Sequence, residues 1–496
     1  MGIVAKQSLY NSIASYLGVI IGAVNTILLF PNVFTPDQYG LTRVLGAAAI
    51  FISLFCSFGV PNVGLKYFPF FRDKKNKHNG FLFGMLAIPF VGYLIFMVLT
   101  YFLKNDIVSY YSGQSILFGT YFNYIALLAF YLVYFNLLDA YLRSLYKSVL
   151  YTFLNGVVLR LCWMILIVLY YFKYLNFDEF IFLYVNVYAL LLLIEVIYII
   201  YLKEFFIVPQ FKKYDKKIVK DMAIFGLFVI FGASSGMVSG TIDSLMIGAL
   251  VEDGLSNVAF YSTAMYIGVM ITIPYGSIIR IATPIISEAW KANNVKKIDE
   301  IYKQTSNNLM LIGTLLFLGI WLNSDNLFQL LPDEYEEARY VLLFVGIAKL
   351  FDVSTGVNAT IIQFSKFFKL MLYFNLLLIV LLIGTNFVLI PIMGIEGAAL
   401  ATLISVVIVN TIRLIIIKIK IDSLPFTKKS LYIPLVGITT YVIVYFVPPF
   451  ENFIVDLILR SITITLLFVP AVYFLKVSKE FNDLIDKVLK LVRVKG

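Results

Sequence analysis

Ionisable side chains within long apolar stretches are the residues of this sequence best placed to bind a charged ligand. A charge at the centre of a membrane costs about 2.5–3.5 kcal/mol on insertion scales, so each one should face protein or water. Arginine and lysine in a wet cleft bind anionic groups. The basic residues of this kind are Arg43, Lys66, Arg160, Arg280, Lys349 and Arg460, and the acidic ones are Asp139, Glu195, Asp243 and Asp352.

Pairing along one helix is an alternative explanation for some of these charges. Lys349 and Asp352 are three residues apart, a spacing at which two side chains on a helix neutralise each other, and we give this equal weight with a role in ion binding. Asp139 and Arg143 are four residues apart near a predicted cytoplasmic helix end. For that second pair a structural ion pair is the favoured interpretation.

Depth in the membrane separates the remaining basic residues. Lys66 and Arg43 lie near predicted helix ends, so they can extend to the interface, and for Lys66 a contact with lipid headgroups competes equally with substrate binding. Arg160 and Arg280 lie too deep to do this easily. For these two we favour a water-filled cavity over a purely structural partner.

Composition excludes the soluble classes of protein. The chain has 496 residues, of which 61% are hydrophobic and 14% charged, and its mean hydropathy is +0.90. A soluble domain carries about 25% charged residues, so most of this exterior must face lipid. Cys56 and Cys162 both lie in apolar runs, and the single histidine leaves no zinc site. No glycine-rich phosphate loop is present, and we expect no cofactor, no nucleic acid and no enzymatic activity.

Apolar stretches of spanning length recur along the whole chain, and fourteen helices of about 20 residues fit it. Thirty of the 39 basic residues fall in alternate loops, at their helix ends and at the termini, six lie within the spans, and only Lys104, Lys173 and Arg339 fall in the opposite loops. The positive-inside rule then places both termini in the cytoplasm, which requires an even number of spans. The expected spans are 9–34, 39–68, 81–103, 117–142, 150–171, 180–202, 222–250, 258–287, 305–322, 338–364, 370–390, 395–417, 431–447 and 453–475.

Spans 1–6 and 7–12 resemble each other as two repeats. Small residues precede Asn25 in span 1 at the same spacing at which Gly232, Gly236 and Gly240 precede Asp243 in span 7. The expected fold is all-α and polytopic, with fourteen transmembrane helices, two six-helix repeats in two lobes and two extra C-terminal helices. The expected parts are an N-lobe (1–203), an inter-lobe linker (204–220), a C-lobe (221–420), helices 13–14 (421–476) and an amphipathic cytoplasmic tail (477–496).

Prolines and glycines mark interrupted helices at matching places in the two repeats. Pro61 in span 2 corresponds to Pro274 in span 8, and such breaks are typical of transport sites and hinges. The glycines of span 7 favour close helix packing, and they also fit the thin wall of a cavity.

Three stretches carry a resemblance to a known family. The sequence 387–405 is similar to the signature "IP-x-x-G-I-x-G-A-A-x-A-T", and 34–40 and 284–302 are similar to two further loops of the same group. Together they resemble the polysaccharide transporter family of the multidrug/oligosaccharidyl-lipid/polysaccharide flippase superfamily. This resemblance covers essentially the whole chain.

The resemblance implies a flippase of the O-antigen or capsule repeat-unit type. Such a protein moves undecaprenyl-diphosphate-linked oligosaccharide from the cytoplasmic to the outer leaflet of the bacterial inner membrane, by alternating access through a cationic central cavity. The partners implied are the polyprenyl-diphosphate-linked oligosaccharide, membrane lipids and a polysaccharide polymerase, with H⁺ or Na⁺ as coupling ion. The expected cavity residues are Arg43, Arg280, Lys66, Arg160 and Asn25, the ion-coupling candidates are Asp243, Asp352 and Lys349, and the hinge or packing residues are Pro61, Pro274, Gly232, Gly236 and Gly240.

Three other functions remain open. A multidrug exporter of the same superfamily normally has twelve spans and an anionic cavity. A lipid II exporter has fourteen spans and an arginine-rich first helix, which is absent here. A membrane-embedded polymerase or glycosyltransferase needs larger external loops than 104–115 and 323–337.

Overall fold

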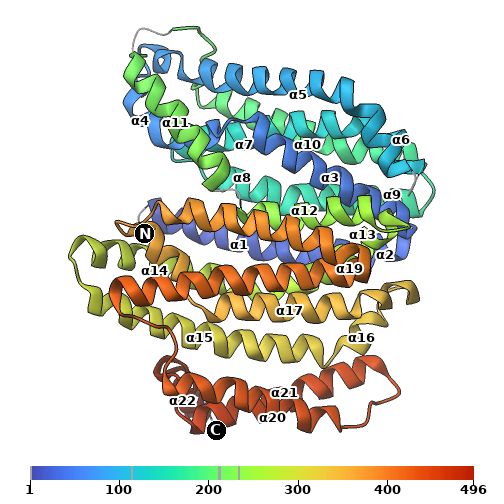
Figure 1. Cartoon of the computed structure of the whole chain (residues 1–496), viewed down its shortest axis with the longest axis vertical. Helices are drawn as coiled ribbons and strands as arrows, with labels where there is room; N and C mark the ends of the chain where they lie inside the picture. The colour runs from blue at the N-terminus through green and yellow to red at the C-terminus, as the bar shows by residue number, and fades with distance from the viewer. Residues whose placement is uncertain (1–2, 113–115, 211–213, 233–234, 496) are drawn as a thin grey trace. The chain divides into compact units, whose positions relative to one another are not determined.

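The computed structural model describes residues 3–112, 116–210, 214–232 and 235–495, and these contain helices and no strand. The chain divides into two compact units, Met1–Ser262 (unit 1) and Thr263–Gly496 (unit 2) (Figure 1). The expected all-α polytopic fold is therefore confirmed. The expected lobe boundaries stay predictions, although α11 and α12 pack against α4 and α3 within unit 1.

Unit 1 is built from helices that are broken at defined points. Its elements are α1 Ile3–Ala23, η1 Val24–Leu29, α2 Phe30–Val33, α3 Pro36–Cys56, α4 Val60–Phe71, η2 Lys77–Gly80, α5 Phe81–Ser112, α6 Ile116–Tyr121, α7 Asn123–Ser144, α8 Val149–Phe153, η3 Leu154–Val158, α9 Leu159–Tyr171, α10 Phe177–Tyr201, α11 Lys216–Gly232, α12 Ser235–Leu250 and, across the boundary, α13 Gly254–Val269. Both η1 and η3 are π-helical, a form that is often found at functional sites.

Local sequence explains where several of these helices begin. Thr35 and Gln38 form a capping box at α3, and Asn176 and Glu179 form one at α10, each satisfying backbone donors that the helix leaves unpaired. Gly59 has a φ of 70° and separates α3 from α4. A side chain at this position would also lie 2.4 Å from the Gly226 carbonyl oxygen, so glycine is required twice.

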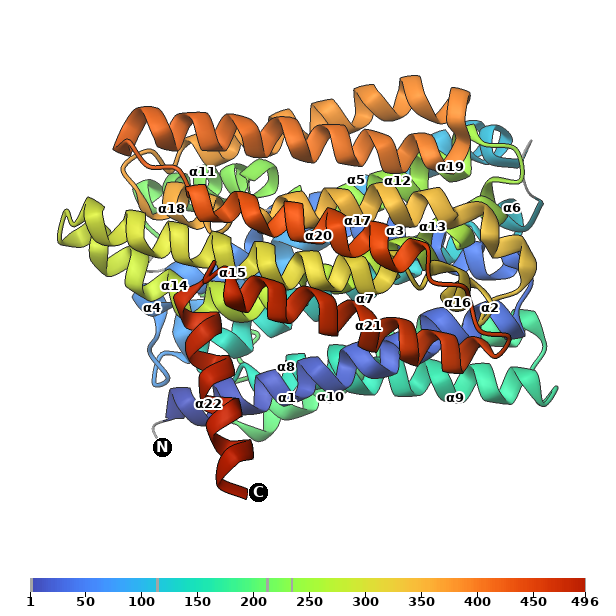
Figure 2. The same cartoon turned by 90° about the horizontal axis from the view of Figure 1, so that it is seen from below.

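Unit 2 contains the remaining helices. Its elements are η4 Met270–Thr272, α14 Ile273–Lys291, α15 Val295–Trp321, α16 Ser324–Phe328, η5 Asp333–Ala338, α17 Arg339–Ser354, α18 Asn358–Phe364, α19 Leu370–Ile421, η6 Lys428–Leu431, α20 Tyr432–Tyr445, α21 Phe453–Phe474 and α22 Lys479–Lys495. The expected C-terminal tail is thus helical, and Figure 2 shows α22 turning away from α21. Its position on a membrane surface stays a prediction.

The 52-residue element α19 is a helical hairpin rather than one rod. A straight helix of this length would be about 78 Å long, more than twice the hydrocarbon thickness. Gly394 has a φ of 59° and a ψ of −135°, and the two arms fold back at this residue (Figures 1 and 2). The hydroxyls of Thr385 and Ser405 approach to 3.5 Å across the arms. The sequence predicted this break between 390 and 395.

Nine helices among the described residues are long and apolar enough to cross a membrane, or ten if a pair bent by 47° at residues 354–358 counts as one span. The number fourteen therefore stays a prediction. Large apolar side chains are exposed along these helices, as on α5, where Ile88, Val91, Ile95 and Val98 are each about half exposed. Such surfaces are stable against lipid, so the protein is a multi-pass membrane protein.

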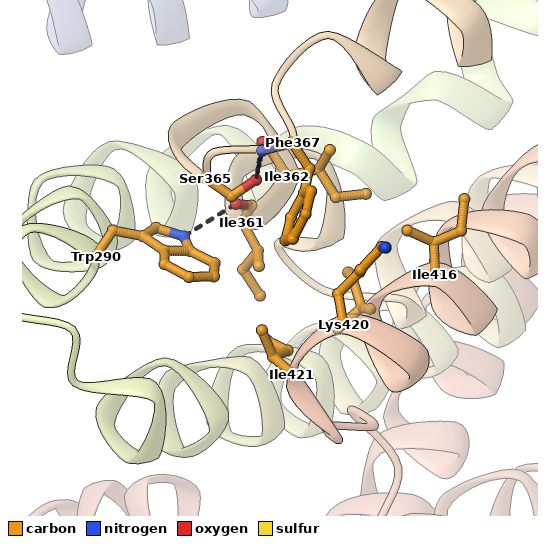
Figure 3. Close-up of a pocket in the computed structure, with 9 residues that line it drawn as sticks. Trp290, Ile361, Ile362, Ser365, Phe367, Ile416, Lys420 and Ile421 are labelled. Carbon is orange, nitrogen blue, oxygen red and sulfur yellow. Dashed lines mark hydrogen bonds between the residues drawn. The ribbon is translucent and has the colours of Figure 1, made fainter.

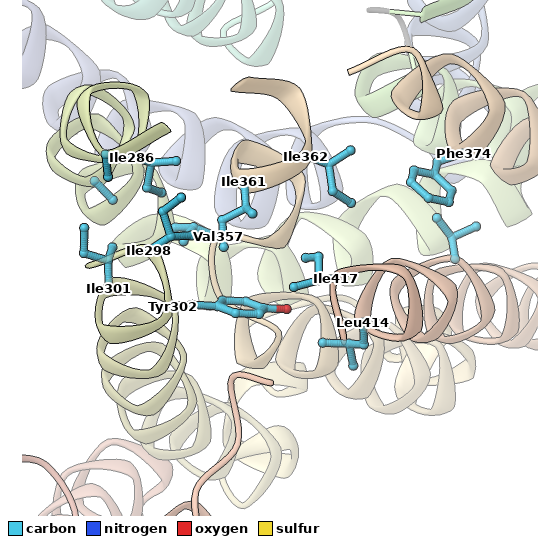
Figure 4. Packing of buried hydrophobic residues seen from close by; sticks show 13 residues of the cluster. Ile286, Ile298, Ile301, Tyr302, Val357, Ile361, Ile362, Phe374, Leu414 and Ile417 are labelled. Carbon is cyan, nitrogen blue, oxygen red and sulfur yellow. The ribbon is translucent and has the colours of Figure 1, made fainter. Parts of the chain in front are cut away.

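Each unit has its own packed core. In unit 2, Ile286, Ile298, Tyr302, Ile361 and Ile417 come together from α14, α15, α18 and α19 (Figure 4). In unit 1 the aromatic rings of Phe68, Phe71, Phe81 and Tyr141 pack together, and the centroids of Phe68 and Tyr141 are 5.4 Å apart. Packing of this density holds each helix, and with it each polar side chain, in one place.

Candidate functional site

A polar cavity of about 880 Å³ lies within unit 1, within the usual size range of ligand pockets. Helices α1, α3, α4, α7, α8, α10, α11 and α12 and the π-helical η3 contribute to its wall. Its polar side chains are Asn11, Ser53, Ser57, Asn62, Asn136, Asp139, Arg143, Ser148, Tyr151, Thr152, Asn155, Tyr188 and Thr241. Of the residues expected at the transport site, Pro61 lines this cavity.

Asp139 and Arg143 form the ion pair that their spacing predicted, with Nη2 of Arg143 2.7 Å from Oδ2 of Asp139. The Asp139 side chain is 4% exposed and that of Arg143 is 43% exposed. The Asp139 carboxylate is therefore buried, while the Arg143 guanidinium is accessible from the cavity. Local spacing identified the pair but not the cavity that it lines.

Arg43 projects from α3 toward hydroxyl groups and aromatic rings. Its Nη2 donates hydrogen bonds to Thr26 Oγ1 at 3.1 Å and to the Tyr39 hydroxyl at 2.7 Å. The guanidinium carbon also lies 4.8 Å from the centre of the Tyr39 ring and 5.6 Å from that of Phe30. These hydroxyls and aromatic faces orient the guanidinium, whose planar donors suit an anionic group.

Asn25 and Arg160 join the two π-helical regions of unit 1. The Asn25 amide donates to the backbone carbonyl of Arg160 at 2.8 Å, and the Arg160 guanidinium donates to the backbone carbonyl of Gly18. The absence of a side chain at Gly18 permits the close approach, because a Cβ there would lie 2.5 Å from the carbonyl oxygen of Gly156. The partner of Arg160 is thus a backbone carbonyl, and neither Asn25 nor Arg160 lines the 880 Å³ cavity.

The other two basic candidates are exposed. Lys66 of α4 has its Nζ 3.9 Å from the centre of the Phe225 ring on α11, a cation–π contact. Arg280 lies on α14 in unit 2, where its hydrogen bond to Ser277 Oγ is long, at 3.5 Å. Both side chains are exposed and so accessible to a ligand or to lipid.

The acidic candidates are held by polar partners. Asp243 of α12 is fully buried and accepts a hydrogen bond from the Tyr261 hydroxyl at 2.7 Å. Asp352 of α17 accepts from the Asn410 amide at 2.9 Å. No ion pair joins Asp352 to Lys349 in the described parts of the chain. Mutual neutralisation, one of the two interpretations of that spacing, is therefore not observed.

Sequence reasoning missed the network around Asp352. The side-chain oxygen Oδ1 of Asn410 accepts hydrogen bonds from Asn358 Nδ2 at 2.8 Å and from Arg413 Nη1 at 3.5 Å. The guanidinium carbon of Arg413 lies 5.6 Å from the centre of the Phe374 ring. Arg413 counted as a cytoplasmic helix-end charge, whereas it lies inside α19. Its spacing of three from Asn410 within an apolar arm was the available signal.

Arg460, one of the basic residues in the spans, is paired along its own helix. Its Nε lies 3.0 Å from Oδ2 of Asp456, and Asn326 donates to the same carboxylate at 2.6 Å. The expectation that it bears on the charge of the cargo is therefore not supported.

Of the hinge candidates, the two prolines lie at helix starts and Gly240 lies within a helix. Pro61 and Pro274 stand in the first turns of α4 and α14, where proline's missing donor is tolerated. Gly240 lies within α12. The packing around Gly232 and Gly236 lies outside the described residues.

A crevice in unit 2 shows what does not qualify as a ligand site. Trp290, Ile361, Ser365 and Lys420 border a space of about 10 Å³, less than a ligand requires (Figure 3). The Trp290 indole donates to the Ile361 carbonyl at 3.0 Å, which fixes α14 on α18. No group of three metal-ligating side chains occurs in the part of the chain that the structure describes.

Comparison with solved structures defines the class of this fold. The inward closed lipid II flippase MurJ superposes with a TM-score of 0.74 at 12% identity, covering 96% of this chain and all of MurJ. An inward-facing multidrug resistance MATE family transporter of the MOP superfamily gives 0.63 at 14% identity, covering 84% and 94%. The fold is thus that of polytopic transporters and not of an enzyme.

Sequence comparison adds the family. Residues 4–290, more than half of the chain, match the family described as "Polysaccharide biosynthesis protein". The chain belongs to this family, within the multidrug/oligosaccharidyl-lipid/polysaccharide flippase superfamily. It is also 22% identical over 300 residues to an uncharacterized membrane protein, MJ1068, of Methanocaldococcus jannaschii. The match spans 57% of that relative's length.

Proposed function

We propose that this protein is a flippase that moves undecaprenyl-diphosphate-linked oligosaccharide repeat units from the cytoplasmic to the outer leaflet of the bacterial inner membrane, with both termini in the cytoplasm. The observation that supports this best is a polysaccharide-biosynthesis family sequence on a flippase-type transporter fold. The cargo would serve surface polysaccharide synthesis of the O-antigen or capsule type, in which a polymerase consumes the product.

The chemistry of the cargo explains the need for buried cations. A diphosphate cannot carry its charge through hydrocarbon, whereas its prenyl tail is stable there. Guanidinium groups in a wet cleft replace the lost hydration with charge-assisted hydrogen bonds. In unit 1 we assign this role to Arg43, which two hydroxyls orient, and to the exposed Lys66. In unit 2 we assign it to the exposed Arg280.

Alternating access requires elements that move and an ion or gradient that drives them. The breaks at Pro61 and Pro274 supply candidate hinges. Asp243 and Asp352 remain the proposed ion-coupling residues inherited from the sequence, with Lys349 beside the second, and H⁺ and Na⁺ are both compatible with their carboxylates.

Substitution of the two arginines tests the proposal. R43A and R280A should each reduce export of lipid-linked oligosaccharide in vesicles, since each removes a diphosphate ligand. R339A is the matched control, because Arg339 is already paired with Asp325 and Glu336. Export at the wild-type rate in R43A, R280A and the double variant would contradict the cationic-cavity mechanism.

The likeness to MurJ supports a second candidate, export of lipid II. Both cargoes are polyprenyl-diphosphate sugars, so the same cations would bind them. Transport assays with lipid II and with a repeat-unit oligosaccharide in the same vesicles separate the two functions. A multidrug exporter would instead move organic cations and neither lipid.

A further inference from the structure

Two carboxyl groups in unit 1 interact electrostatically, and one of them is completely buried. Glu195 of α10 has none of its surface exposed, and neither of its carboxyl oxygens has a hydrogen-bond partner among the described residues. The carboxyl of Asp139, on α7, lies close enough to interact electrostatically with it. The diphosphate-binding groups proposed above include neither residue.

The charged and titratable groups near Glu195 lie on α7 and α9, which pack against α10, and on α8. Helix α7 supplies Asp139 and its partner Arg143. Tyr151 of α8 interacts electrostatically with both acids and with Arg143. On α9, the guanidinium of Arg160 is bonded instead to the Gly18 carbonyl. Arg143 thus pairs with Asp139, and none of the ion pairs among the described residues includes Glu195.

The charge count leaves one proton to be added. An ionised carboxylate that is removed from water and accepts no hydrogen bond is strongly unfavourable, so a group in this position takes up a proton instead. With Glu195 neutral, the remaining Asp139–Arg143 pair carries no net charge. We propose that Glu195 and Asp139 together bind one exchangeable proton beside the 880 Å³ cavity.

The cavity provides the route by which this proton exchanges. Asp139, Arg143 and Tyr151 line the cavity, whereas Glu195 does not. Oδ1 of Asp139 has no hydrogen-bond partner among the described residues, while Oδ2 stays with Arg143. The proton passes from the Glu195 hydroxyl to Oδ1 of Asp139 and is released to the cavity. The Glu195 carboxylate that remains is the unfavourable state, and the return of a proton by the same route relieves it.

This site would supply the coupling ion of the transporter, a role that rests on the proposed function. It names H⁺ as the ion and places it in unit 1, on residues other than Asp243 and Asp352. A buried carboxyl whose charge changes would alter the stability of the α7–α10 contact, and so bias one conformation of unit 1 over another.

Infrared difference spectroscopy of the purified full-length protein tests the binding site without any transport assay. At neutral pH the wild type minus E195Q spectrum should contain the carbonyl band of a protonated carboxylic acid. E204Q is the control, because Glu204 is an ion-paired surface carboxylate and its substitution should remove no such band. Size-exclusion chromatography verifies that each variant is folded.

A second experiment tests the coupling role. Vesicles containing the wild type should transport a lipid-linked oligosaccharide faster under a proton gradient than without one, and E195Q should lose this stimulation. Absence of the protonated band from the wild-type difference spectrum would overturn the proton site. The band together with undiminished stimulation in E195Q would overturn the coupling role. Absence of oligosaccharide transport by the wild type, with the band present, would instead contradict the proposed function alone.

Discussion

Replacing Gly18 by alanine tests the contact between α1 and η3 in unit 1. The added Cβ would lie 2.5 Å from the Gly156 carbonyl oxygen, against 3.4–4 Å for ordinary contact, so the two backbones must separate by about 1 Å. The nearest atoms are the O, C and Cα atoms of Gly156, which all belong to the backbone, so no side chain can rotate away. The Arg160 guanidinium bond to the Gly18 carbonyl and the Asn25 bond to the Arg160 carbonyl cross the same contact.

The magnitude follows from these contacts. Overpacking costs about 1–3 kcal/mol, and weakening two buried hydrogen bonds adds about 1 kcal/mol each. The intrinsic preference of alanine over glycine in a helix returns about 1 kcal/mol, so we expect a net loss of about 2–4 kcal/mol.

Thermal unfolding of the purified variants in detergent measures this loss as a lower Tm than that of the wild type. G46A is the matched control, because a side chain at Gly46 of α3 would meet nothing within 4 Å, and it should be neutral or stabilising. A G18A protein as stable as G46A would refute the close helix contact on which the reasoning depends.

Three other perturbations have defined outcomes. R143Q leaves the buried Asp139 carboxylate without its ion-pair partner and should lower the free energy of unfolding by about 1–3 kcal/mol, measured as a lower Tm. The expected loss is at the lower end for a buried pair because the Arg143 side chain is partly exposed. Burial tends to raise the pKa of Glu204, but hydrogen bonds from Lys74 and His78 outweigh this and hold the pKa below its usual range. The stability that Glu204 contributes is therefore present at neutral pH and is lost as the pH falls through the lowered value, so the Tm difference between wild type and E204Q should vanish in acid; a constant difference would refute it. N410L breaks the polar network within unit 2 and should cost about 1–3 kcal/mol, and an unchanged Tm would show that the network is not stabilising.

Features that depend on neighbours along the chain were predictable. The Asp139–Arg143 pair follows from a spacing of four, which places two side chains on one face of a helix before any packing is known. The break at Gly394 was predictable too, because the expected spans on either side were each long enough to cross a membrane and left only a short connection.

Features that depend on distant segments could not be predicted in this way. Arg160 has a backbone carbonyl of α1 as its partner, a contact that requires two helices to approach at glycines far apart in sequence. Arg413 joins Asn410 in a polar network with Asp352 because a hairpin arm packs against α17. Its position near the end of the expected span 395–417 indicated only a cytoplasmic helix end.

The sequence by itself determined that this is a polytopic helical membrane protein of a polysaccharide biosynthesis family, because hydropathy, loop charge and short motifs are local properties. Only the tertiary structure decided which charges are compensated. Arg460 has Asp456 beside it, whereas Glu195 has no hydrogen-bond donor among the described residues. The energy of a buried charge depends on every group around it in space, and that arrangement is fixed by helix packing rather than by neighbours in the chain.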